Sequence, residues 1–241
     1  MDRNAAKAEL DAAIAEAWRV FDLPRPATTG VCLESCRNEE VAADFLSFDA
    51  RDLPLSYVKE WIDAPCSNHL SFANVGWLMP RFMEGMADDN STMFEIYGEE
   101  ATLRRLALTG FPARWPGHAA STVSCFASGL FDYRIARGLM PCELDETVCA
   151  WVSAGIPVAF FTTRLDALPD ATLADALYRN RGVREWGNEI PISPAWWDPG
   201  RSEWWAWQTS EALLDRMTRA GLAGDDRAAA VSDVIHRALH G

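Results

Sequence analysis

The sequence lacks the features that would assign it to a familiar class of enzyme. It contains no GxxxxGK[ST], GxGxxG, HExxH or GxSxG pattern, so no nucleotide-binding, metalloprotease or serine-hydrolase signature is present. Lysine is scarce as well, since Lys7 and Lys59 are the only two and the other basic residues are arginine. We attribute that bias to coding. Without these signatures an enzyme is still an open alternative, but it is the less favoured class of function.

Long apolar runs are also missing. Two uncharged stretches, 115–131 and 147–163, are shorter than the ~20 residues that a membrane-spanning helix needs. The N-terminal segment is charged and amphipathic and has no apolar segment typical of a secretory signal. Six cysteines without such a signal indicate free thiols in a reducing compartment. We therefore expect a cytoplasmic protein that does not engage a membrane.

No segment shows the alternating pattern of a β-strand. Apolar residues recur at helical spacing instead, which predicts an all-α fold of about ten packed helices. We expect one domain over residues 1–241, with an alternative internal boundary near 180–201, a Pro/Trp-rich segment. The main predicted helices span about 4–21, 55–62, 70–87, 92–108, 119–137, 144–154, 158–168, 170–178, 203–220 and 226–239. The helix near 119–137 carries mostly apolar and small residues, so we expect it at the centre of the fold.

Negative charge is concentrated in the first part of the chain. Residues 1–100 hold 19 acidic and 8 basic side chains, whereas residues 101–241 hold 16 and 14, and the net charge is −13. Such a surface repels phosphate backbones, which argues against nucleic acid as a direct partner. It favours solvation or a basic protein partner. The acidic pairs Asp88–Asp89 and Glu99–Glu100 are candidate contacts for that partner, and the alternative is that they are solvated helix ends.

Four soft ligands form two short pairs. Cys32 and Cys36 form one pair and Cys66 and His69 the other, with 29 residues between Cys36 and Cys66, an arrangement that a structural zinc site could use. Buried free thiols are the competing interpretation, because free cysteine is among the most buried residue types. Zinc is the one cofactor that the sequence suggests.

Six of the eleven tryptophans lie within residues 186–207. Trp196 and Trp197 belong to a proline-rich segment that could pack onto the core as a strap, form a protein-binding surface or line a ligand pocket. If residues 203–220 form one helix, Trp207 falls on the apolar stripe, Trp204 at its edge and Trp205 on the polar face. Trp205 is therefore the strongest binding candidate of the three.

A scattered set of residues resembles an uncharacterised family of small bacterial cytoplasmic proteins. The residues that carry the resemblance are Arg25-Pro26, Cys32, Cys36, Glu40, Ala42, Leu46, Arg51-Asp52-Leu53, Leu55, Leu78-Met79-Pro80-Arg81, Met83-Glu84 and Trp115-Pro116. They cover residues 20–135. The resemblance implies an α-helical bacterial protein and no particular activity.

The sequence favours an acidic protein-interaction protein. Such a protein could resemble an immunity protein or antitoxin that neutralises a basic partner. Two alternatives stay open, an enzyme or small-ligand-binding protein with a pocket lined by the tryptophan strap, and a zinc-stabilised structural domain.

Overall fold

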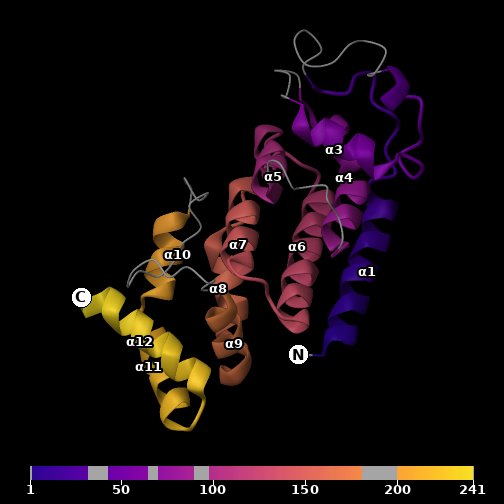
Figure 1. The fold of residues 1–241 in the computed structure, drawn as a ribbon. Coiled ribbons are helices and arrows are strands. Elements are labelled where there is room, and N and C mark those ends of the chain that lie inside the picture. The colour runs from indigo at the N-terminus through magenta and orange to yellow at the C-terminus, as the bar shows by residue number, and fades with distance from the viewer. Residues whose placement is uncertain (1, 32–42, 65–69, 90–97, 181–199, 241) are drawn as a thin grey trace. The chain divides into compact units, whose positions relative to one another are not determined.

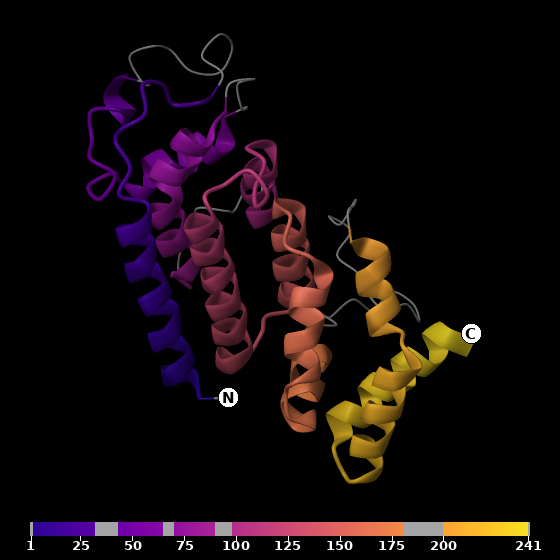
Figure 2. The same ribbon diagram turned by 180° about the vertical axis from the view of Figure 1, so that it is seen from behind.

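The protein is α-helical throughout the part of the chain that the structure describes. The computed structural model describes residues 2–31, 43–64, 70–89, 98–180 and 200–240, which form eleven helices and no strand. This confirms the predicted all-α fold (Figures 1 and 2). The helices are α1 (Arg3–Val20), α3 (Leu55–Asp63), α4 (Phe72–Ala87), α5 (Gly98–Leu108), α6 (Gly117–Arg137), α7 (Glu143–Ala154), α8 (Val158–Asp166), α9 (Asp170–Asn180), α10 (Arg201–Gln208), α11 (Glu211–Leu222) and α12 (Asp226–His240).

The chain divides into two compact units at residues 133 and 134. One unit is Asp2–Tyr133 and the other is Arg134–Gly241, so the last turn of α6 belongs to the second unit. The prediction of one domain with an alternative boundary near 180–201 stays a prediction, and the strap proposed there lies outside the described residues. None of the helices described is both long and apolar enough to cross a lipid bilayer.

In the unit Asp2–Tyr133, α4 packs against α1, α3 and α5. Nearly every side chain of α4 is buried, including Pro80, and the helix continues through that proline. The sequence predicts a helix over 70–87 that Pro80 kinks or splits; α4 has nearly that extent and is not split. The capping box between Ser71 and Asn74 fixes where α4 begins.

Arg105 on α5 ties that helix to the end of α3. Its side chain is only 7 % exposed, and its guanidinium donates to the carbonyl oxygens of Trp61, Ile62 and Ala64. The same group lies 4.4 Å from the centre of the Trp61 ring. The last carbonyls of a helix have no partner within the helix, so a buried arginine that binds them stabilises both helices.

In the unit Arg134–Gly241, α9 packs against α7, α11 and α12, and α8 packs against α7 and α10. The last two helices run side by side and are joined by a short turn (Figures 1 and 2). Asp225 accepts hydrogen bonds from the backbone N–H groups of Arg227 and Ala228 and so caps α12.

The predicted helix 203–220 is in fact two helices. α10 ends at Gln208, and α11 begins after Ser210, whose hydroxyl accepts from the backbone N–H of Leu213. α10 begins at Arg201, so Ser202 lies inside it, and the residue that precedes its first turn is Gly200 with φ 93°. A Cβ at Gly200 would lie 2.6 Å from a methyl group of Val152 and 2.9 Å from one of Val158, so only glycine allows α10 to approach α7 and α8 this closely.

Candidate functional site

Because α10 and α11 are separate helices, the tryptophans are arranged differently from the expectation. Trp204 is fully buried, whereas Trp207 is half-buried. The expectation that Trp207 lies in the core and Trp204 at its edge is therefore wrong. The projection treated residues 203–220 as one helix. It therefore extended the apolar face of α11 into α10, although a break separates the two helices.

The indole of Trp204 ends on a buried carboxylate. Its Nε1–H donates to Oδ1 of Asp145 over 2.8 Å, and Nε2 of Gln208 donates to the same oxygen over 3.0 Å. Asp145 is itself fully buried on α7, and its backbone N–H donates to Oδ1 of Asn180 on α9 over 3.1 Å. One residue of α7 thus connects this helix to α9 and α10.

Two arginines at the end of α6 bind a second buried carboxylate. Glu143, at the start of α7, pairs with Arg134 over 3.5 Å and with Arg137 in a bidentate contact. Arg134 also donates to the hydroxyl of Thr147 over 2.8 Å. Arg134 and Glu143 are each less than 9 % exposed. Buried charges are tolerated when they are paired and hydrogen-bonded, so this cluster fixes the α6–α7 turn.

The buried carboxylate of Asp145 is linked to an open pocket through a pair of stacked indoles. The rings of Trp204 and Trp207 are 5.0 Å apart at their centroids and inclined by 15°. Nε1–H of Trp207 then donates to Oδ1 of Asp166, at the end of α8, over 3.1 Å. The aromatic pair therefore has one end in the core and the other in a pocket.

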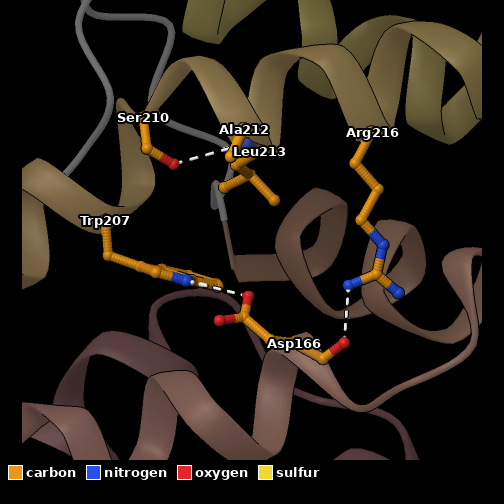
Figure 3. A pocket seen from close by; sticks show the side chains of 6 residues that line it. All are labelled: Asp166, Trp207, Ser210, Ala212, Leu213 and Arg216. Carbon is orange, nitrogen blue, oxygen red and sulfur yellow. Dashed lines mark hydrogen bonds between the residues drawn. The ribbon is translucent and has the colours of Figure 1, made fainter.

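The pocket has a volume of about 290 Å³ and lies between the end of α8, the end of α10 and the first turns of α11 (Figure 3). Its walls are formed by Asp166, Trp207, Ser210, Ala212, Leu213 and Arg216. Arg216 donates to the carbonyl oxygens of Asp166 and Leu168 and to the carboxylate of Asp170. The arrangement presents an aromatic ring, a carboxylate and an apolar side chain to whatever enters.

The predicted binding residues fall in different places. Trp205 is half-buried on α10 and does not line the pocket, and Trp196 and Trp197 lie outside the described residues. Asp88 and Asp89 are exposed, and Asp89 accepts from the Tyr133 hydroxyl over 2.8 Å.

The second acidic pair lies at the start of a helix. Glu99 and Glu100 lie in the first turn of α5 and are half-buried. Carboxylates at such a position are stabilised by the helix dipole, and the binding role of this pair stays a prediction.

The four candidate zinc ligands, Cys32, Cys36, Cys66 and His69, all lie outside the described residues. Within the described part of the chain, no three His, Cys, Asp or Glu side chains are grouped so that they could hold a metal ion. The zinc site stays a prediction.

Sequence reasoning missed the groups that matter most in this site, Asp145, Arg134 and Asp166. Asp145 lies between Cys142 and Cys149 together with Glu143 and Glu146, and no structural or binding role was predicted for it. A signal was present, since Asp145 precedes an almost uninterrupted apolar stretch from Thr147 to Ala154. An acidic residue at the start of a buried helix requires buried donors, and tryptophan and glutamine supply them.

Comparison of the chain with models of protein families, with curated proteins and with solved structures finds no match. The resemblance to an uncharacterised bacterial family therefore stays a prediction.

Proposed function

We propose that the protein binds and neutralises a basic protein partner through the surface of the unit Asp2–Tyr133, in the manner of an immunity protein or antitoxin. The observation that carries the proposal is the charge of that unit, in which 20 acidic side chains face 11 basic ones. The remainder of the chain is closer to balance, with 15 and 11. The charge excess thus belongs mainly to one compact unit.

The acidic groups of this unit are largely at its surface. Nine of the carboxylate side chains that the structure describes are exposed: Asp2, Glu9, Asp11, Asp22, Asp44, Asp49, Asp52, Asp88 and Asp89. These carboxylates repel one another and attract a basic partner at long range, before contact. The attraction speeds association.

Two basic side chains of the same unit offset the negative charge of its surface only in part. Arg105 is buried on backbone carbonyls, and Arg81, whose side chain is 19 % exposed, donates to the carbonyl oxygen of Leu53 and to Glu84. A buried guanidinium contributes less to the field outside than an exposed one. The surface seen by a partner is therefore more acidic than the residue count alone suggests.

The chemistry of this surface selects among partners. It repels nucleic acid, and it suits a protein with a basic face, met in the cytoplasm if the cysteines are reduced as the sequence predicts. The long-range attraction depends on ionic strength, so a complex of this kind weakens as salt screens the charges.

The test is capture of a partner by the purified protein and by a charge-neutralised variant. The variant combines Glu9→Gln, Asp22→Asn and Asp52→Asn, all at exposed positions of the acidic unit. A matched control combines Glu211→Gln, Asp226→Asn and Asp233→Asn in the other unit, which removes the same charge. We expect a basic protein to be retained by the native protein and the control and to be lost from the variant.

Salt provides the second criterion. The complex should dissociate in about 0.5 M NaCl, where the screening length falls to about 4 Å. The proposal fails if no basic protein is retained, or if a retained complex withstands that salt and all three neutralising substitutions.

A further inference from the structure

We infer that the pocket bounded by Asp166, Trp207 and Arg216 receives a guanidinium or ammonium group, supplied by an arginine or lysine side chain of a protein partner. This inference goes beyond the proposed function, because the pocket lies in the unit Arg134–Gly241, and it rests on that function for the source of the side chain. It is carried by the geometry of the pocket itself, which is separate from the acidic surface described above.

The aromatic wall of the pocket is suited to a cation. One face of the Trp207 ring is covered by Trp204, which stacks on it at a centroid distance of 5.0 Å. Trp207 lines the pocket and is half-buried, so part of its ring is accessible from the pocket. Tryptophan is the best of the aromatic residues at binding cations over its ring.

A carboxylate lies at the edge of the same ring. The indole N–H of Trp207 donates to Oδ1 of Asp166 over 3.1 Å, which fixes the two groups relative to each other (Figure 3). An ionised carboxylate has about four acceptor positions, so Asp166 has the capacity to accept from a ligand as well. A ring face beside a carboxylate matches a guanidinium, which stacks through its plane and donates through its edge.

Among the described residues that line the pocket, the cationic side chain is Arg216, and its guanidinium already has acceptors. The guanidinium of Arg216 donates through Nε to Asp170 over 2.6 Å, through Nη1 to the carbonyl oxygen of Asp166 over 2.9 Å and through Nη2 to that of Leu168. All three of its nitrogens thus have acceptors within the protein. Arg216 therefore shapes the wall of the pocket and makes a poor site for an anion.

The size of the pocket limits the ligand. Its volume of about 290 Å³ lies at the lower end of the range of about 300 to 1,000 Å³ usual for small-molecule sites. Such a space suits a single side chain better than a nucleotide or another large cofactor. The apolar side chain of Leu213 can contact the methylene stem of an arginine or lysine.

The experiment follows the indole N–H signal of Trp207 by ¹H–¹⁵N NMR during titration with N-acetyl-arginine amide. The signal is assigned among those of the eleven tryptophans by its loss in Trp207→Phe. The matched probe is N-acetyl-citrulline amide, which has nearly the same shape and no charge. We expect a saturable shift of the Trp207 signal with the arginine probe and none with the citrulline probe.

Two variants test the role of Asp166. Asp166→Asn keeps an acceptor for Trp207 and removes the charge, and we expect it to lower the association constant of the arginine probe about threefold to fivefold. Asp215→Asn removes an exposed charge from α11 outside the pocket and should leave that constant unchanged. Equal shifts with both probes, no shift at all, or equal affinity in Asp166→Asn would each overturn the inference.

A third probe distinguishes the source of the cation. If putrescine, a free diamine, binds more than about tenfold more tightly than the capped arginine, the pocket serves a small amine and the inference of a partner side chain is overturned. The probes are small molecules, so failure to capture a partner leaves the test of the pocket intact. Conversely, partner capture without any response of Trp207 overturns the pocket alone.

Discussion

Asp145 is a single carboxylate on which two side-chain donors of α10 converge. Both Trp204 and Gln208 donate to its Oδ1 atom, and all three residues are buried. A buried donor that loses its acceptor keeps the cost of its desolvation, so the loss of this oxygen affects two donors at once.

We expect Asp145→Ala to lower the free energy of unfolding by about 3 to 5 kcal/mol, because two buried donors lose an acceptor. Asp145→Asn, which can still accept at Oδ1, should lose clearly less. Urea denaturation followed by circular dichroism measures both. Asp215→Ala, at an exposed position of α11, is the control and should change stability by less than about 0.5 kcal/mol. Equal losses in the alanine and asparagine variants would contradict a role for the hydrogen bonds.

The neighbouring tryptophans should differ sharply in their contribution. Trp204→Ala removes a fully buried indole and should cost about 3 to 5 kcal/mol, whereas Trp205→Ala, at a half-buried position, should cost less than half as much. The same urea denaturation decides this, provided that the two variants have equal m-values. A loss for Trp205→Ala as large as that for Trp204→Ala would place Trp205 in the core and remove it as a binding residue.

At the scale of the helix, the break between α10 and α11 depends on one cap. Ser210→Ala removes the hydroxyl that accepts from the backbone N–H of Leu213 and should cost about 1 kcal/mol. Ser202→Ala is the matched control, because Ser202 lies inside α10 at an exposed position. Thermal unfolding of the two variants measures the difference. If Ser202→Ala were the more damaging, the single helix predicted from the sequence would be the better description.

The sequence predicted most helices to within a few residues and missed this break for a physical reason. Thr209 and Ser210 are tolerated inside helices, so the apolar spacing could be followed across them. Tertiary contacts separate the two helices. In α10, Trp204 is held by its hydrogen bond to Asp145, whereas α11 buries Leu213 and Met217. Pro80 is the opposite case, because its buried neighbourhood keeps α4 unsplit through a residue that weakens isolated helices.

The candidate site was predictable only in part. Clustering of tryptophans pointed to the correct segment, and the charge count pointed to an acidic unit. The pocket joins Asp166 to Arg216 across 50 residues of sequence, a pairing for which local spacing holds no signal.

At the scale of the whole molecule, the net charge of −13 should lower the stability of the folded protein. We expect the melting temperature at pH 7 to rise by roughly 2 to 4 °C as NaCl is raised from low to moderate concentration, because salt screens repulsion among the acidic groups. The variant with Glu9→Gln, Asp22→Asn and Asp52→Asn should show a smaller rise. Differential scanning calorimetry measures both, and a melting temperature that falls with NaCl would contradict the expectation.

The stacked pair of Trp204 and Trp207 has a thermodynamic consequence. One indole is hydrogen-bonded to the interior at Asp145 and the other to the pocket at Asp166. A cation that binds only when the stack is formed stabilises the seating of α10, and by reciprocity anything that loosens α10 weakens the cation's affinity to the same degree. The occupancy of the pocket by a cation and the packing of α10 on the core are therefore coupled in one equilibrium.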